Sequence, residues 1–118
     1  MISIDLVWSV GSSLTMLGPC EVTFDFSLRI HVGFYISFAG PITFKSSKNA
    51  AEMIQLVPND KILVETDSPY LAPEPVRGTR NTPINVKYVA QKIADVKGLT
   101  LEEVANITYE NTKKIFKI

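Results

Sequence analysis

Residues 61–73, which read KILVETDSPYLAP, constrain the fold of this chain more than any other segment. They begin with the apolar run Ile62, Leu63 and Val64, which is typical of a strand buried on both faces. Pro69 cannot donate a ladder hydrogen bond, so this strand must end near Asp67. We therefore expect Asp67 at the carboxyl end of a buried strand, where α/β proteins place their catalytic groups.

A second buried strand is predicted over residues 33–40, which read GFYISFAG and are rich in aromatic and β-branched residues. The intervening residues predict a helix that Ser46 or Ser47 could cap, because apolar residues recur at helical spacing. Those residues are Ala50, Met53, Ile54 and Val57. The pattern predicts a strand-helix-strand unit with parallel strands, and hence the α/β class.

Two helices are predicted after a proline-rich loop at residues 68–82. The first should be capped by Asn81 or Thr82 and end at Gly98. Its predicted buried face is Val86, Val89, Ala90, Ile93 and Ala94. The second opens with Thr100 and Glu103 in a capping box. Its predicted buried stripe is Leu101, Val104, Ala105, Thr108 and Ile115.

The amino-terminal residues have weaker patterns. Residues 2–10 and 21–30 alternate as strands do, and residues 11–13 read as a turn. We divide the chain into an amino-terminal segment, residues 1–32, and a carboxyl-terminal part, residues 33–118.

Composition limits the classes of protein to consider. The 118 residues fit one domain, and 46% hydrophobic content with a mean hydropathy of +0.14 is typical of globular chains. The formal net charge is zero, so no overall basic field holds nucleic acid. One cysteine excludes an internal disulfide, and no apolar run approaches the roughly 20 residues of a membrane span. We expect a cytoplasmic protein without membrane contact.

Two carboxylates are the first candidates for chemistry. Because side chains alternate along a strand, Glu65 and Asp67 are expected on one face and Thr66 on the other, so the two carboxylates could form at most part of a metal shell. The alternative is that Asp67 caps the turn before Pro69 while Glu65 pairs with a nearby base. The chain has one histidine, His31, so a histidine-rich metal site cannot be assembled from it.

The proline-rich loop carries Arg77, Arg80 and Asn81, whose guanidinium and amide groups suit a phosphodiester. The alternative is an exposed, solvated loop. Cys20 and His31 could form a nucleophile and base, but no third group is placed to orient them. Cys20 is better explained as a small packed side chain.

Residues 33–118 resemble the carboxyl-terminal part of TatD-type metal-dependent deoxyribonucleases. The matching segments are GFYISFAG, ITFK, LVETDSPYLAP, Arg77-Gly78 with Asn81 and Pro83, and Glu110-Asn111. The resemblance implies the last two βα units and the terminal helices of a distorted TIM barrel of the metallo-hydrolase type. Its final strands would be residues 34–38 and 62–66.

This resemblance also implies a chemistry. In the family a divalent metal pair, often Mg²⁺, activates water to hydrolyse phosphodiester bonds in DNA. Asp67 matches the aspartate at the end of the last strand, a metal ligand that also helps to position or deprotonate the water. Arg77 and Asn81 match loop residues near the substrate opening, and Arg80 lies beside them.

The departures from the family pattern are equally informative. A full barrel needs about 250 residues, and the family's earlier histidines and mid-chain glutamate have no counterpart here. We therefore expect little or no nuclease activity from this chain alone. The alternative is a non-catalytic remnant or an interaction module that self-associates through exposed sheet edges.

Overall fold

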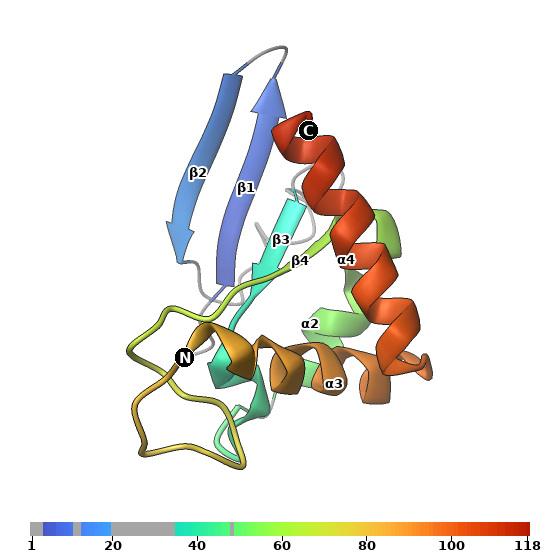
Figure 1. Ribbon diagram of the computed structural model, residues 1–118. Helices are drawn as coiled ribbons and strands as arrows, with labels where there is room; N and C mark the ends of the chain where they lie inside the picture. Colours follow the sequence, from blue (N-terminus) through green and yellow to red (C-terminus); the bar gives the residue numbers. More distant parts are fainter. Residues whose placement is uncertain (1–3, 11–12, 20–34, 48) are drawn as a thin grey trace.

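The structure is a computed structural model that describes residues 4–10, 13–19, 35–47 and 49–118. These residues form a four-stranded sheet in the order β2-β1-β3-β4, with the helices gathered at its β3–β4 end (Figure 1). The strands are β1 (Ile4–Val10), β2 (Ser13–Pro19), β3 (Tyr35–Phe38) and β4 (Ile62–Val64). The α-helices are α2 (Ala50–Leu56), α3 (Val86–Lys97) and α4 (Leu101–Phe116), and the short 3-10 helices are η1 (Gly40–Thr43), η2 (Asn59–Lys61) and η3 (Pro83–Asn85).

The predicted parallel strand pair is confirmed. Ile36 lies opposite Ile62 and Phe38 opposite Val64 in a parallel register, and α2 connects the two strands. Ile36 and Phe38 are fully buried, as the apolar character of this segment predicted. Because the strands are parallel, the loops that follow β3 and β4 both leave from the carboxyl ends of the strands, at the same end of the sheet.

A hairpin of β1 and β2 extends the sheet on the other side of β3. The expected strand within residues 2–10 is confirmed as β1, which pairs antiparallel with both β2 and β3. β2 is not among the predicted strands, and its sequence includes Gly18 and Pro19, which are unfavourable in strands. The strand predicted at residues 21–30 lies outside the described residues, as do Cys20 and His31.

The predicted serine cap of α2 is wrong. Asn49 occupies the N-cap of α2 without a side-chain hydrogen bond, whereas the Ser47 hydroxyl donates to the Pro41 carbonyl at 2.7 Å. At the next helix, Thr82 occupies the N-cap of η3, as predicted, although its side chain makes no capping hydrogen bond, and η3 continues directly into α3. At α2 the serines are separated from the helix by further residues, so local sequence misplaced its first turn.

The ends of α3 and α4 follow the sequence more closely. Gly98 ends α3 in the left-handed conformation with φ 68°, and Thr100 and Glu103 form the predicted capping box. In α4, Leu101 and Ala105 are exposed, so their predicted burial is wrong, whereas Val104, Thr108 and Ile115 are buried. Within the described ranges, no helix has the length and apolar character needed to cross a bilayer.

One core joins the parallel strands to the helices. Its buried members are Ile36, Phe38, Ile42, Ala50, Met53, Ile54, Val57, Ile62, Val89, Ala90, Ile93, Ala94 and Val104. Polar contacts fasten α2 to α3, since Gln55 Nε2 donates to the Val96 carbonyl and Lys97 Nζ to the Val57 carbonyl. This packing fixes the carboxyl ends of β3 and β4, from which the loops of the candidate site leave.

Candidate functional site

Asp67 lies just beyond the carboxyl end of β4, as predicted, but not on the strand itself. The strand ends at Val64, and Asp67 is half-buried with φ 56°, a left-handed conformation that few non-glycine residues adopt. The prediction that strand alternation carries Glu65 and Asp67 onto one face is therefore wrong. A turn follows, in which the Tyr70 N–H donates to the Asp67 carbonyl at 2.9 Å across a cis Ser68–Pro69 bond.

The buried side chain of Asn81 holds this turn from the protein interior. Asn81 is 2% exposed, and its Nδ2 donates to the carbonyls of Thr66 at 2.5 Å and Tyr70 at 2.8 Å. Its backbone N–H donates to the Pro69 carbonyl at 3.0 Å, and its Oδ1 accepts from Asn85 Nδ2 at 3.0 Å. These bonds bracket Asp67 on both sides, so Asn81 determines where the Asp67 backbone lies.

The loop is also packed closely against η1. A Cβ atom at Gly40 would overlap the Leu71 carbonyl oxygen, so only glycine permits this approach. The Thr43 hydroxyl donates to the Gly40 carbonyl at 2.7 Å and accepts from the Glu74 N–H at 2.8 Å. Leu71 is in the left-handed region with φ 57°. Strained backbone held by such contacts is characteristic of functional loops.

A groove of about 490 Å³ opens between these segments at the carboxyl ends of the strands. It is lined by Phe44, Pro69, Tyr70, Leu71, Ala72, Arg77, Gly78 and Thr79. The Arg77 guanidinium lies 3.8 Å above the centre of the Phe44 ring, and the Tyr70 side chain is 73% exposed. Stacking of this kind orients a guanidinium while leaving its N–H groups able to bind an oxyanion.

The structure thus brings only some of the predicted site residues together. Arg77 lines the groove beside the turn that carries Asp67, and Asn81 supports that turn from inside the protein. Arg80 is exposed and is not among the groove-lining residues. Sequence reasoning missed Phe44 and Tyr70 as groove residues, although the aromatic residue directly after Pro69 was an available signal.

A divalent hydrolytic metal does not fit the described residues on their own. Such a metal takes at least three protein ligands, and the described residues contain no group of three or more His, Cys, Asp or Glu side chains placed to hold one. Asp67 is in a position to supply one ligand of a larger set.

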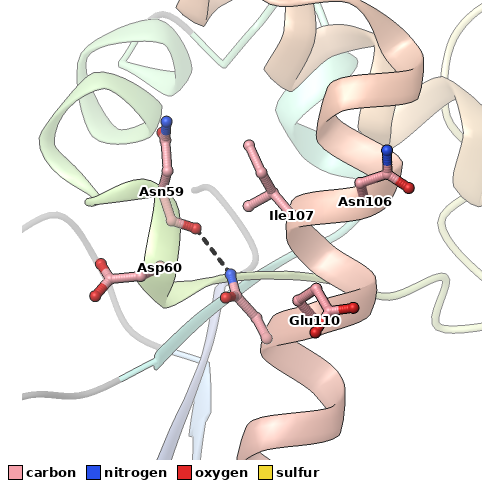
Figure 2. Close-up of a pocket in the computed structure, with 6 residues that line it drawn as sticks. Asn59, Asp60, Asn106, Ile107 and Glu110 are labelled. Atoms are coloured by element: carbon pink, nitrogen blue, oxygen red, sulfur yellow. Dashed lines mark hydrogen bonds between the residues drawn. The ribbon is translucent and has the colours of Figure 1, made fainter.

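A second hollow, of about 340 Å³, lies at the opposite end of β4 (Figure 2). Its lining includes Asp60, Glu110 and the half-buried Ile107, which lies between α4 and the η2 segment in Figure 2. Asn111 is buried there, and its Nδ2 donates to the carbonyls of Asn59 and Ile62, each at 2.8 Å. These bonds join α4 to the start of β4, which indicates a structural role at the amino ends of the strands.

The sequence model of the family described as TatD-related DNase matches residues 21–117. The chain belongs to this family. Its TatD-family relatives include the uncharacterized metal-dependent hydrolase YabD of Bacillus subtilis, 53% identical over 87 residues. They also include the uncharacterized metal-dependent hydrolase YcfH of Escherichia coli K12, 46% identical over 89 residues. These matches cover 74% and 75% of this chain but 34% of each relative, so the chain spans about a third of their length.

Solved structures of TatD-family proteins are similar in fold to this chain. The structure of YjjV, a TatD homologue from Escherichia coli K12, matches with a TM-score of 0.73 and 22% identity, over 84% of this chain and 39% of YjjV. A TatD-family hydrolase from Entamoeba histolytica matches with a TM-score of 0.63 and 17% identity, over 75% of this chain and 38% of that protein. The predicted α/β fold, a partial TIM barrel, is confirmed.

Proposed function

We propose that this chain provides the carboxyl-terminal wall of a TatD-type site that hydrolyses phosphodiester bonds in DNA with a divalent metal, Mg²⁺ being the expected ion. Family membership supports the reaction class, and YabD and YcfH are named metal-dependent hydrolases. The observation that carries the proposal for this chain is the position of Asp67, which is held just beyond β4 at the edge where TIM barrels do their chemistry.

Within this site we assign Asp67 as a metal ligand and catalytic carboxylate. Arg77 is assigned to a phosphate of the substrate, because its guanidinium is stacked on Phe44 at the rim of the groove. Arg80 is exposed nearby in sequence and adds positive charge that attracts the DNA backbone. Asn81 serves the substrate indirectly, since its buried amide holds the turn of Asp67.

The incomplete metal set makes the chain inactive by itself under this proposal. A second candidate function, a non-catalytic family remnant that acts through interaction, is favoured by the same observation that the described residues contain no three-ligand group. The two functions differ in whether Asp67 can still serve in a complete barrel.

A chimera tests this difference. Residues 33–118 would replace the matching third of Bacillus subtilis YabD, with which the chain shares 53% identity. We expect Mg²⁺-dependent cleavage of a DNA oligonucleotide, and Asp67→Ala should lower its rate at least about 100-fold, because losing a metal ligand removes several kcal/mol of transition-state stabilisation.

Asp60→Ala is the matched control, because Asp60 is an exposed acid at the other end of β4 and should leave the rate unchanged. A folded chimera that shows no Mg²⁺-dependent cleavage, while intact YabD cleaves the same DNA, would support the remnant instead. Equal rates for the chimera and its Asp67→Ala variant would show that Asp67 has no role in catalysis or metal binding.

A further inference from the structure

The groove of about 490 Å³ beside the Asp67 turn combines one cation with aromatic and apolar side chains. Arg77 is its charged member, and the described residues that line it include no aspartate or glutamate. Phe44 and Tyr70 contribute the aromatic rings. Such a lining is complementary to a ligand that joins an anionic group to a flat ring system, because the guanidinium binds the anion and an aromatic side chain stacks on the ring.

Tyr70 is the aromatic residue of this groove that is available for stacking. Phe44 is half-buried, and the Arg77 guanidinium carbon lies 3.8 Å from the centre of its ring, so one face of that ring is already covered. The Tyr70 side chain, in contrast, is 73% exposed. A ring exposed to this degree presents a face to a ligand that enters the groove.

Hydrogen bonds on both sides of Tyr70 fix the backbone that carries its ring. The Tyr70 N–H donates to the Asp67 carbonyl at 2.9 Å, and the Tyr70 carbonyl accepts from the buried Asn81 amide at 2.8 Å. Only the two side-chain dihedral angles of Tyr70 remain to be ordered when a ligand binds. The entropy cost of stacking on this ring is therefore small.

The segment that carries Arg77 is held by two consecutive turns. The Val76 N–H donates to the Pro73 carbonyl at 2.9 Å. The Thr79 N–H and hydroxyl both donate to the Val76 carbonyl, at 3.2 Å and 2.6 Å. The cation and the Tyr70 ring therefore line one groove from two segments whose backbones are each held by hydrogen bonds.

We propose that Tyr70 is a specificity-determining residue, which stacks on the nucleobase next to the phosphate that Arg77 binds. This assignment rests on the proposed function, because that function supplies a nucleic-acid ligand. Every base has a face on which an aromatic ring stacks, but the larger ring system of a purine overlaps it more fully. The groove should therefore accept each base and favour a purine.

The fluorescence of 2-aminopurine tests the proposal without any activity measurement. The probe is a five-nucleotide single strand that is abasic except for a central 2-aminopurine, mixed with the full chain in EDTA so that no divalent metal takes part. Stacking on Tyr70 should quench its fluorescence. An unlabelled strand with a central adenine should displace the probe better than one with thymine, and at least about five-fold better than a fully abasic strand of the same charge.

Substitutions at Tyr70 separate stacking from attraction to the phosphates. Tyr70→Ala should weaken binding at least about five-fold and abolish the quenching, whereas Tyr70→Phe should retain both, because stacking needs the ring and not the hydroxyl. Tyr109→Ala is the matched control and should bind as the wild type does, since Tyr109 is 62% exposed on α4 and lines a separate groove between α3 and α4.

Equal affinities of the wild type and Tyr70→Ala, or equal displacement by the adenine and abasic strands, would overturn the proposal. The chimera with YabD distinguishes this failure from a failure of the proposed function. If the chimera cleaves DNA and Tyr70→Ala leaves its KM unchanged, the stacking role is wrong and the hydrolytic function stands. If the chimera does not cleave DNA but this chain shows quenching that depends on Tyr70, the stacking role is supported and the hydrolytic function is wrong.

Discussion

At the scale of single residues, Asn81 holds the turn that carries the candidate site. Its amide joins Thr66 and Tyr70 on either side of Asp67, and its side chain is almost completely buried. The sequence marked Asn81 as a substrate contact, and that role stays a prediction. The structure adds a positioning role, because the same amide determines the path of the backbone that presents the carboxylate.

Asn81→Asp tests this positioning role. The substitution keeps the shape of the side chain but replaces the Nδ2 donor with an oxygen that faces two carbonyls. We expect the free energy of unfolding in urea to fall by about 2–4 kcal/mol, because unsatisfied buried acceptors cost about 1–3 kcal/mol each. Asn85→Asp removes a single bond to Asn81 Oδ1 and should cost about 1 kcal/mol. Equal losses in the two variants would show that the Asn81 amide does not hold the loop.

At the scale of elements, Lys97 fastens α3 to the end of α2. Its Nζ donates to the Val57 carbonyl at 2.7 Å, where α2 has ended and its carbonyls need donors. Burial lowers the pKa of Lys97 below its ordinary value of 10.5, because desolvation disfavours the charged form. The burial of this ammonium group therefore makes the stability of the folded chain depend on pH.

The sign of that dependence can be checked with Lys97→Met. Between the lowered pKa and 10.5 the unfolded chain binds more protons than the folded one, so the unfolding free energy of the wild type rises with pH. Lys97→Met should cost about 1 kcal/mol at neutral pH through the lost hydrogen bond, and its deficit should grow as the pH approaches 10.5. Lys92→Met on the same helix is the control. A deficit that shrinks with rising pH would contradict this account.

At the scale of the whole molecule, β4 is the terminal strand of the described sheet. The described residues form two parallel strands of a barrel with an antiparallel hairpin on one side, and β4 ends the sheet on the other. The chain spans about a third of the length of YabD and YcfH. Exposed strand edges promote association.

Two measurements on the purified chain test this view. Isothermal titration with Mg²⁺ or Mn²⁺ should show no binding at micromolar strength in either the wild type or Asp67→Ala, because one carboxylate cannot hold the ion. Sedimentation should show self-association that increases with concentration, because exposed sheet edges can pair between copies. A monomer that melts sharply, or tight metal binding that Asp67→Ala abolishes, would instead indicate a small fold that is complete by itself.

Local patterns in the sequence were sufficient for the parallel strands, the end of α3 at Gly98, the capping box of α4 and the placement of Asp67 after β4. These features depend on residues close together in the chain, whose periodicity and capping chemistry are readable directly. The matching motifs likewise sufficed to indicate the family.

Only the tertiary structure decided the left-handed conformation of Asp67, the bonds of Asn81, the stacking of Arg77 on Phe44 and the antiparallel pairing of β1 with β3. It also decided that Leu101 and Ala105 are exposed, although their spacing predicted burial. Each of these features depends on contacts between segments far apart in the chain. Local propensity and periodicity do not indicate which distant segment completes such a contact. The contact stabilises the fold only when both segments are in place.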